Sequence, residues 1–173
     1  MSPFFYMKIY IIGFMASGKT TMGKILAETL NMPFHDIDQL IETQEDIAIN
    51  EIFVKSGEEY FRHLESEMLK NLTEEAVYSC GGGIISSQTS LRILQQKTDL
   101  TIWLNPEWNI IVKRITFSSR PLAKGKSIEQ LYKLYEERIR LYESIADIDF
   151  RGTELNELLS KIKKMPGFNT GHK

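Results

Sequence analysis

The sequence GFMASGKT at residues 13–20 matches G-x-x-x-x-G-K-[ST], the pattern of a loop that binds nucleotide phosphates. A β-branched and aromatic run precedes it at residues 7–12, and apolar residues at helical spacing follow it as far as Leu30. The loop therefore lies between an expected strand and an expected helix, which is the context that its chemistry requires. A glycine-containing turn that binds nothing is the alternative, and the lysine, the threonine and the flanking segments together argue against it.

The residue types in this loop indicate how it would hold a triphosphate. Gly13 and Gly18 allow main-chain conformations in which successive N–H groups turn toward a phosphate. The N-terminus of the following helix adds further N–H donors and the positive end of its dipole. Lys19 would reach the β- and γ-phosphates, and the hydroxyl of Thr20 would ligate Mg²⁺. We expect the side chain of Met15 to pack outward while the main chain binds the phosphates.

Length and composition restrict the class of protein. The chain has 173 residues, enough for one domain with a small lid, and its 42% hydrophobic and 25% charged residues are typical of a globular protein. A net charge of −2 gives no reason to expect nucleic acid as a partner. The single cysteine, Cys80, excludes an internal disulfide and suits a reducing cytosol. Lys8 and Gly13 interrupt the apolar N-terminal run, so we expect a first strand there and neither a signal peptide nor a membrane span.

Strand and helix patterns alternate along the chain. Strands are expected at 7–12, 34–38, 77–80, 100–104 and 145–150, and helices at 21–30, 39–43, 47–55, 58–72, 87–96, 106–115, 127–142 and 154–164. This alternation predicts a parallel sheet covered by helices on both faces, with ligands at the carboxyl ends of the strands. The polar segment 118–126 suits a mobile lid, and the tail from Pro166 is expected to fray.

Several chemically active residues would meet at those strand ends. They are Asp36, Asp38, Arg62, Gly81, Gly82, Gly83, Arg114, Arg120 and Arg138. Arginine suits bidentate capture of carboxylate or phosphate, and glycines after a strand allow close approach of a ligand. Aspartates near a phosphate loop can hold Mg²⁺ through water or accept a proton from a hydroxyl. No aspartate precedes the glycine triplet, so a Walker-B-type ligand is missing there and the metal role shifts to Asp36.

Six motifs make nearly the whole chain resemble the shikimate kinases. They are GFMASGKT at 13–20, DID at 36–38, FRHLE at 61–65, GGG at 81–83, SRPL at 119–122 and ERIRLY at 137–142. The resemblance implies an α/β, three-layer P-loop kinase fold like that of nucleoside monophosphate kinases, with five parallel strands and helices on both faces. It also implies one domain over residues 1–173, with the phosphate loop at 13–21, a substrate-binding subdomain at 36–65 and a lid at 117–126.

The same resemblance implies an activity. A shikimate kinase transfers the γ-phosphoryl group of ATP, with Mg²⁺, to the 3-hydroxyl of shikimate, giving shikimate 3-phosphate and ADP in aromatic amino acid biosynthesis. We therefore expect a cytoplasmic monomer whose partners are ATP and shikimate, and neither nucleic acid nor a membrane. The rival hypotheses are a gluconate kinase-like or nucleoside monophosphate kinase of the same fold, and a non-catalytic regulatory protein that only binds nucleotide. The intact lysine, aspartates and lid arginine argue against the last of these.

The roles of individual residues also follow from the resemblance. The implied catalytic residues are Asp38, Lys19 and Arg120, and the implied metal ligands are Thr20 and, through water, Asp36. The implied nucleotide-binding residues are Gly13, Ala16, Ser17, Gly18, Lys19, Thr20, Thr21, Arg114 and Arg120, with the adenine near residues 151–154. The implied substrate-binding residues are Asp38, Arg62, Gly81, Gly82, Gly83 and Arg138. Outside this pattern the arginines would be solvated surface charges and the two aspartates would be helix caps.

Helical geometry adds two expectations about the arginines. Arg62 and Glu65 are three positions apart on one expected helix, so the glutamate can fix the direction of the guanidinium. Arg138 and Arg140 are two positions apart and point to nearly opposite sides of theirs, so only one of them can face the cleft. The family pattern selects Arg138. Together, Arg62 and Arg138 favour an acceptor that carries a carboxylate.

Overall fold

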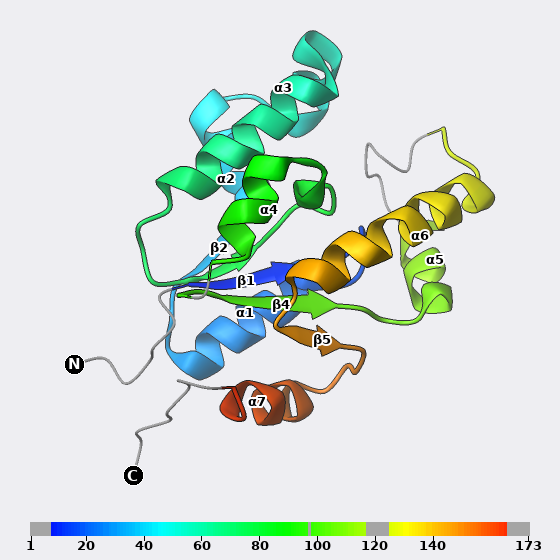
Figure 1. Cartoon of the computed structure of the whole chain (residues 1–173). Helices are drawn as coiled ribbons and strands as arrows, with labels where there is room; N and C mark the ends of the chain where they lie inside the picture. The colour runs from blue at the N-terminus through cyan, green and yellow to red at the C-terminus, as the bar shows by residue number, and fades with distance from the viewer. Residues whose placement is uncertain (1–7, 97, 117–124, 166–173) are drawn as a thin grey trace.

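The computed structural model describes residues 8–96, 98–116 and 125–165. Five strands form one sheet in the order β2-β3-β1-β4-β5, and every neighbouring pair is parallel (Figure 1). The strands are β1 (Ile9–Ile12), β2 (Phe34–Asp36), β3 (Val77–Ser79), β4 (Leu100–Leu104) and β5 (Ile148–Phe150). The predicted five-stranded parallel sheet is therefore confirmed.

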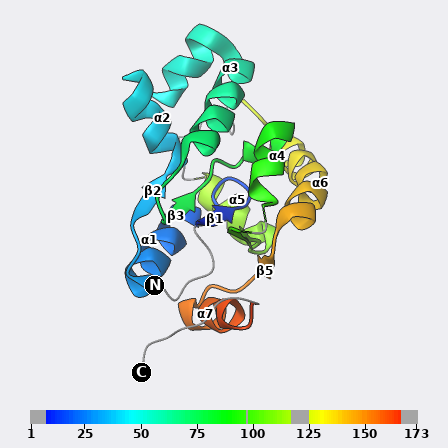
Figure 2. The ribbon, with the colours of Figure 1, turned by 60° about the vertical axis from the view of Figure 1, so that its left-hand side comes forward.

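Helices cover both faces of this sheet. They are α1 (Lys19–Leu30), α2 (Ile37–Glu45), α3 (Ile49–Asn71), α4 (Gln88–Leu94), α5 (Trp108–Thr116), α6 (Ile128–Ile145) and α7 (Leu155–Lys163), with a short 3₁₀ helix η1 (Ile84–Ser86). Figures 1 and 2 show α1 and α7 on one face, and α3, α4 and α6 on the other. The fold thus has the three predicted layers.

The central strand β1 explains where the two cores lie. Its four residues are all buried, and their side chains alternate between the faces. Tyr10 and Ile12 enter the core under α3, α4 and α6, whereas Ile9 and Ile11 enter the core over α1 and α7. Because β1 pairs with both β3 and β4, the loop that follows it emerges at the middle of the carboxyl edge of the sheet. This is where a doubly covered parallel sheet binds its ligands.

The second strand is shorter than the sequence pattern predicts. It ends at Asp36, whose side chain accepts a hydrogen bond from the N–H of Asp38 at 3.1 Å and so caps α2. Asp38 therefore lies in the first turn of a helix, and the prediction of a strand through residue 38 is wrong. The capping geometry explains the difference, because an aspartate at this position ends the strand and starts the helix at once.

A kink at Gly57 divides α3. The sequence predicts two helices, at 47–55 and 58–72, and the structure joins them into one element in which Gly57 has φ 81° and ψ 173°. That conformation is open to glycine and costly for other residues. The two halves of α3 consequently differ in direction, and both contribute to the site described next.

Candidate active site

The loop after β1 has the close main-chain approach that its glycines predict. A Cβ on Gly13 would lie 2.5 Å from the carbonyl oxygen of Leu104, and Gly18 has φ 99° at the N-cap of α1. Lys19 is buried, and its ammonium donates hydrogen bonds to the carbonyl oxygens of Gly13 at 3.0 Å and Phe14 at 2.9 Å. The lysine therefore lies inside the curve of the loop.

A strained alanine directs one carbonyl of the loop toward α5. Ala16 has φ 61°, in the left-handed region, where a Cβ costs about 1–2 kcal/mol. Its carbonyl oxygen accepts a hydrogen bond from Nη1 of Arg114 at 3.2 Å. The same guanidinium nitrogen would lie 3.2 Å from a Cβ on Gly18. Arg114 thus lies against the phosphate loop.

Three oxygen-bearing side chains meet beside the first turn of α1. Thr20 Oγ1 donates to Asp36 Oδ2 at 2.8 Å, and Ser79 Oγ at the end of β3 lies 3.4 Å from the same hydroxyl. Ser79 lies at the strand end where the sequence carries no Walker-B aspartate. In the described residues, no three His, Cys, Asp or Glu side chains gather closely enough to hold a metal by themselves. An ion here would depend on phosphate oxygens and water for most of its coordination, as Mg²⁺ usually does.

A cavity of about 320 Å³ opens on one side of the loop. Its lining residues are Met15, Gly18, Lys19, Thr20, Asp36, Asp38, Glu42, Ile49, Asn50, Phe53, Phe61, Arg62, Glu65, Ser79, Cys80, Gly81, Gly82 and Gly83. The structure thus brings together both predicted aspartates, one predicted arginine and the glycine triplet. The lining also includes two aromatic rings, Phe53 and Phe61, whose centroids are 4.9 Å apart, and the guanidinium of Arg62 lies 5.2 Å from the ring centroid of Phe61.

Arg62 is held by two glutamates of its own helix. Its Nη2 donates to Glu58 at 2.9 Å and its Nη1 to Glu65 at 2.5 Å, so the predicted pairing with Glu65 is present. Burial opposes the charge and acts to lower the pKa of Arg62, but the two carboxylates outweigh it and raise the pKa overall. The guanidinium lies where a Cβ on Gly83 would stand, 2.2 Å from Nη2. Glycine at 83 is therefore what lets Arg62 reach the cavity.

Glu65 is a buried carboxylate in the wall of this cavity. Burial raises its pKa to about 7, Arg62 opposes that shift, and nearby Asp38 adds to it. Its Oε1 has no hydrogen-bond partner among the described residues and would lie 2.5 Å from a Cβ on Gly81. Asp38 Oδ1 would lie 2.9 Å from the same point. Two carboxylate oxygens therefore converge beside Gly81.

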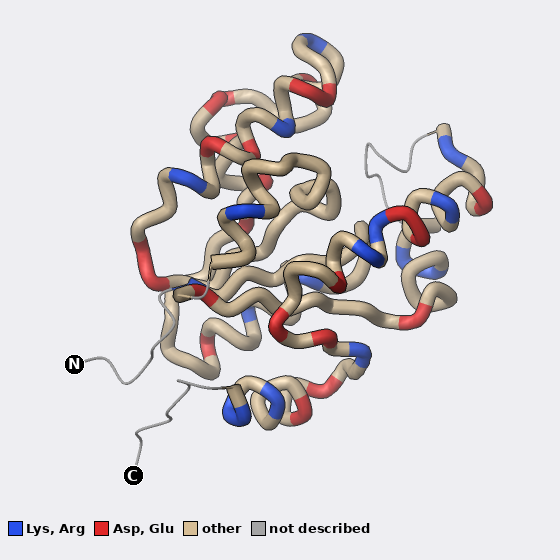
Figure 3. Tube along the Cα trace, viewed as in Figure 1, with Lys and Arg blue, Asp and Glu red and all other residues tan. Residues whose placement is uncertain are grey.

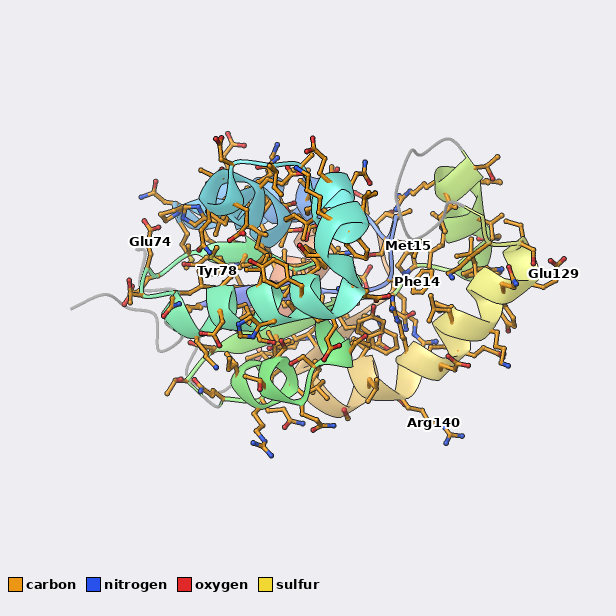
Figure 4. All side chains as sticks on the ribbon, turned by 90° about the horizontal axis from the view of Figure 1, so that it is seen from above. Phe14, Met15, Glu74, Tyr78, Glu129 and Arg140 are labelled. Carbon is orange, nitrogen blue, oxygen red and sulfur yellow. The ribbon has the colours of Figure 1, made fainter. Side chains whose placement is uncertain are left out.

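Arg138 approaches the glycine triplet from α6. It is 7% exposed, and its Nη1 donates to the carbonyl oxygen of Gly82 at 3.1 Å. It does not line the 320 Å³ cavity, but it reaches Gly82, which does. Arg140 is exposed and projects away from α6 in Figure 4, so the predicted opposition of these two arginines is confirmed.

A second cavity, of about 430 Å³, opens on the other side of the loop. Its lining residues are Ala16, Ser17, Gly18, Lys19, Thr20, Thr21, Met22, Ile25, Leu104, Pro106, Arg114, Phe150, Gly152 and Thr153. Gly152 and Thr153 belong to the segment predicted to lie near an adenine. The two cavities share Gly18, Lys19 and Thr20, so the lysine lies where they meet.

One expectation about the loop is wrong, and one lies outside the described residues. Met15 was expected to pack outward, but it is 3% exposed and lines the 320 Å³ cavity, because the loop turns back over the glycine triplet. Arg120 and residues 117–124 of the predicted lid lie outside the described residues.

Sequence reasoning missed several members of the site. Tyr142 donates a hydrogen bond to Gly82, Ser79 lies beside Thr20, and Phe53, Phe61 and Asn50 line the first cavity. The apolar members carry the same signal as core residues, so periodicity alone cannot separate them. Tyr142 is the last residue of the ERIRLY motif, so the motif could have identified it as a member of the site.

Two further observations concern the distribution of charged residues and the polarity of the helices. Acidic and basic residues are interspersed along α3, α6 and α7 (Figure 3). Among the residues that the structure describes, every helix is too short or too polar to cross a bilayer.

Comparison with known proteins agrees with this geometry. The family model described as shikimate kinase matches residues 15–165. A shikimate kinase of Aquifex aeolicus (strain VF5) is 39% identical over 158 residues, which are 90% of this chain and 92% of the relative. A solved shikimate kinase from Acinetobacter baumannii in complex with shikimate superposes with a TM-score of 0.83 at 30% identity, over 91% of this chain and 90% of that one. The Aquifex aeolicus crystal structure superposes with a TM-score of 0.78 at 37% identity, over 91% and 96% of the two chains. The fold, the loop and these comparisons agree, and the chain belongs to the shikimate kinase family.

Proposed function

We propose that this protein transfers the γ-phosphoryl group of ATP to the 3-hydroxyl of shikimate, releasing shikimate 3-phosphate and ADP. Membership of the family makes it an ATP-dependent kinase of aromatic amino acid biosynthesis that phosphorylates shikimate. The observation that carries the finer proposal is that two cavities meet at Gly18, Lys19 and Thr20. A donor in one and an acceptor in the other would face each other across the lysine, which is the alignment that phosphoryl transfer needs.

The 430 Å³ cavity is the proposed site of ATP. The loop N–H groups and the N-terminus of α1 would bind the phosphates, with Arg114 close beside them. Lys19 would exchange the carbonyls of Gly13 and Phe14 for the β- and γ-phosphates. Gly152 and Thr153 also line this cavity, which supports placing the adenine beside them. Arg120, from the lid, would add positive charge over the phosphates.

Thr20 and Asp36 would hold Mg²⁺, with Asp36 acting through water. Their oxygens lie 2.8 Å apart next to the loop, and Mg²⁺ in kinases combines one or two protein oxygens with water and phosphate. When bound, the ion neutralises charge on the β- and γ-phosphate oxygens. The oxygen donors present therefore fit this ion, with the hydroxyl of Ser79 as a further neutral neighbour.

The 320 Å³ cavity is the proposed site of shikimate. Arg62 and Arg138 would bind its carboxylate, and the N–H groups of the glycine triplet would bind its ring hydroxyls. Asp38 would orient the reacting hydroxyl and accept its proton as the oxygen bonds to the γ-phosphorus and the bond to ADP breaks. The wall formed by Phe53 and Phe61 would cover the apolar part of the ring. In this assignment residues 36–65 form the substrate-binding region and residues 117–126 the lid of a monomeric, cytoplasmic enzyme.

The test is ADP release from ATP and Mg²⁺ with shikimate, gluconate and nucleoside monophosphates as separate acceptors. Release that depends on shikimate, with NMR showing phosphate on the 3-hydroxyl, is the expected result. Release with gluconate or a nucleotide in place of shikimate would overturn the acceptor assignment and leave a kinase of the same fold. ATP binding without turnover on any acceptor would favour the regulatory alternative.

A further inference from the structure

One side chain of the phosphate loop faces the acceptor residues and not the nucleotide cavity. Phe14 is 1% exposed and lines neither of the two cavities. Its carbonyl oxygen accepts the hydrogen bond from Lys19, while its ring packs edge-on against Tyr135 at 5.5 Å and near Trp108 at 6.1 Å. The ring is therefore fixed from α5 and α6, the two helices that flank the predicted lid.

The guanidinium of Arg138 lies over this ring. Its Cζ is 5.8 Å from the ring centroid of Phe14, within the range of a cation–π interaction. Among the described residues, none of the ion pairs includes Arg138, which is 7% exposed. A buried cation is costly unless neighbouring groups compensate its charge. The carbonyl of Gly82 and the ring of Phe14 contact the guanidinium directly. Glu65 and the hydroxyl of Tyr142 also interact with it, because the charge of Arg138 acts to lower the pKa of each of these groups.

We propose that Phe14 is a positioning residue for Arg138 and thereby sets the affinity for the carboxylate of the acceptor. The inference rests on the proposed function, because it takes Arg138 as part of the carboxylate clamp. When Arg138 turns its Nη1 from Gly82 to a carboxylate, the hydrogen bond is exchanged but the ring contact can remain. The aromatic face thus holds the guanidinium near its binding position before the acceptor arrives, which lowers the ordering cost of binding.

The substitution Phe14→Leu separates the aromatic face from simple packing. Leucine fills much of the space but lacks the ring quadrupole that attracts a cation. We expect the KM for shikimate, and its Kd by calorimetry, to rise about five- to tenfold, as the loss of a largely desolvated cation–π contact implies. The KM for ATP should rise less than the KM for shikimate, because the side chain of Phe14 does not line the nucleotide cavity.

A double-mutant cycle with Arg138→Met tests whether the effect passes through the arginine. Arg138→Met alone should weaken shikimate binding, and adding Phe14→Leu should weaken it no further. Phe34→Leu is the matched control, because Lys24 Nζ lies 5.9 Å from the ring of Phe34 and neither residue lines the acceptor cavity. Phe34→Leu should lower the melting temperature without changing the KM for shikimate, because Phe34 does not line the acceptor cavity.

Three outcomes would overturn the inference in an enzyme that phosphorylates shikimate. They are an unchanged KM for shikimate in Phe14→Leu, an equal rise in the KM values of both substrates, and a further loss on adding Phe14→Leu to Arg138→Met. Phe14→Met serves in the same cycle if Phe14→Leu does not fold, because methionine adapts to irregular cores and also lacks the ring. Absence of shikimate phosphorylation in the wild type would instead contradict the proposed function, so the two failures can be told apart.

Discussion

The hydroxyl of Tyr142 donates a hydrogen bond of 2.6 Å to the carbonyl oxygen of Gly82. The ring of Tyr142 is completely buried and stacks on Trp103 at 5.7 Å, so this donor is fixed in place. A trans peptide points its N–H opposite to its C=O, and the bond therefore also sets the direction of the N–H of Gly83. Tyr142 thus orients a main-chain donor of the proposed shikimate site from the core of the protein.

Tyr142→Phe should weaken shikimate binding without affecting ATP. The change removes one buried hydrogen bond, which is worth about 1 kcal/mol net, and leaves the carbonyl of Gly82 with Arg138 alone. We expect the KM for shikimate to rise about three- to tenfold, corresponding to roughly 0.7–1.4 kcal/mol. The KM for ATP should stay constant and the melting temperature should fall. Steady-state kinetics and a thermal scan measure both effects.

Tyr10→Phe is the control for removing a buried hydroxyl. Tyr10 lies on β1 with its hydroxyl buried and without a hydrogen-bond partner among the described residues. Its removal should leave the KM for shikimate unchanged and stability equal or higher, because no partner loses a bond. Equal effects of the two substitutions on shikimate would show that Tyr142 has no special role.

Thr20→Val should make turnover depend on a higher Mg²⁺ concentration. Valine keeps the shape of threonine but lacks the hydroxyl that lies 2.8 Å from Asp36. We expect the Mg²⁺ concentration for half-maximal rate to rise about tenfold or more, because the loss of a group that supports a metal site typically weakens metal binding by at least that factor. Thr20→Ser retains the hydroxyl and should keep most of the wild-type response. Identical magnesium titrations for the valine and serine variants would argue against a metal role for this hydroxyl.

The sequence contains enough information to predict the sheet, the loop and most charged members of the site. The loop motif fixes the spacing of Gly13, Gly18 and Lys19, and their positions after β1 follow from the alternation of strands and helices. Arg62 and Glu65 are correctly paired because helical spacing alone brings them together. These are local relationships, and local patterns predict them.

Contacts between distant segments could not be predicted in this way. Met15 lies inward because the loop meets Gly82, about 70 residues later, where a Cβ would be 3.0 Å from the N of Met15. The position of Phe14 beneath Arg138 likewise depends on how α6 packs against the loop. The sequence pattern predicts Asp38 in a strand, but the side chain of Asp36 caps a helix that includes Asp38. Strand propensity and helix capping compete at this point, and the tertiary context decides between them.

Gly83→Ala should disable the proposed carboxylate clamp while the protein still folds. A methyl group at this position would lie 2.2 Å from Nη2 and 2.3 Å from Cζ of Arg62, so the guanidinium must move. Gly83 has φ −103°, which alanine also adopts, and the obstacle is the end of a flexible side chain. We expect a rise of about tenfold or more in the KM for shikimate, the size of one lost charged hydrogen bond, with little change in melting temperature. Unfolding of the variant, or an unchanged KM, would contradict this explanation.

Glu65→Gln should change how stability depends on pH. Burial, with the help of Asp38, raises the pKa of Glu65 to about 7 against the pull of Arg62, whereas in the unfolded chain it lies near the ordinary value of about 4.3. The folded state therefore binds more protons between these values, and the wild type loses stability as the pH rises from about 4.3 to about 7. Glutamine has no such proton, so the stability of the wild type relative to this variant should fall across that window and level off above it. Urea unfolding of both proteins at pH 5, 6, 7 and 8 measures the difference. Parallel profiles would show that Glu65 does not titrate there.

Asp38→Asn should nearly abolish turnover and leave nucleotide binding intact. Asparagine retains the shape of the side chain but cannot fill the proposed role of accepting the proton of the reacting hydroxyl, and a lost general base costs about 10²–10⁴-fold in rate. The bond from the main-chain N–H of residue 38 to Asp36 survives, so the start of α2 should stay folded. Single-turnover kinetics and ATP titration measure the two effects.

Asp46→Asn, at the opposite end of α2, is the control for Asp38→Asn. Asp46 has φ 55°, a left-handed conformation that asparagine tolerates, and it lines neither cavity. Asp46→Asn removes a negative charge at the end of the same helix but away from both cavities, so it should leave the rate unchanged. The Asp38 variant carries a second signature, because Asp38 helps to raise the pKa of Glu65 and its loss should lower that pKa. An Asp38→Asn enzyme with a normal rate would remove Asp38 from the chemical step and leave it only a role in shaping the carboxylate pair beside Gly81.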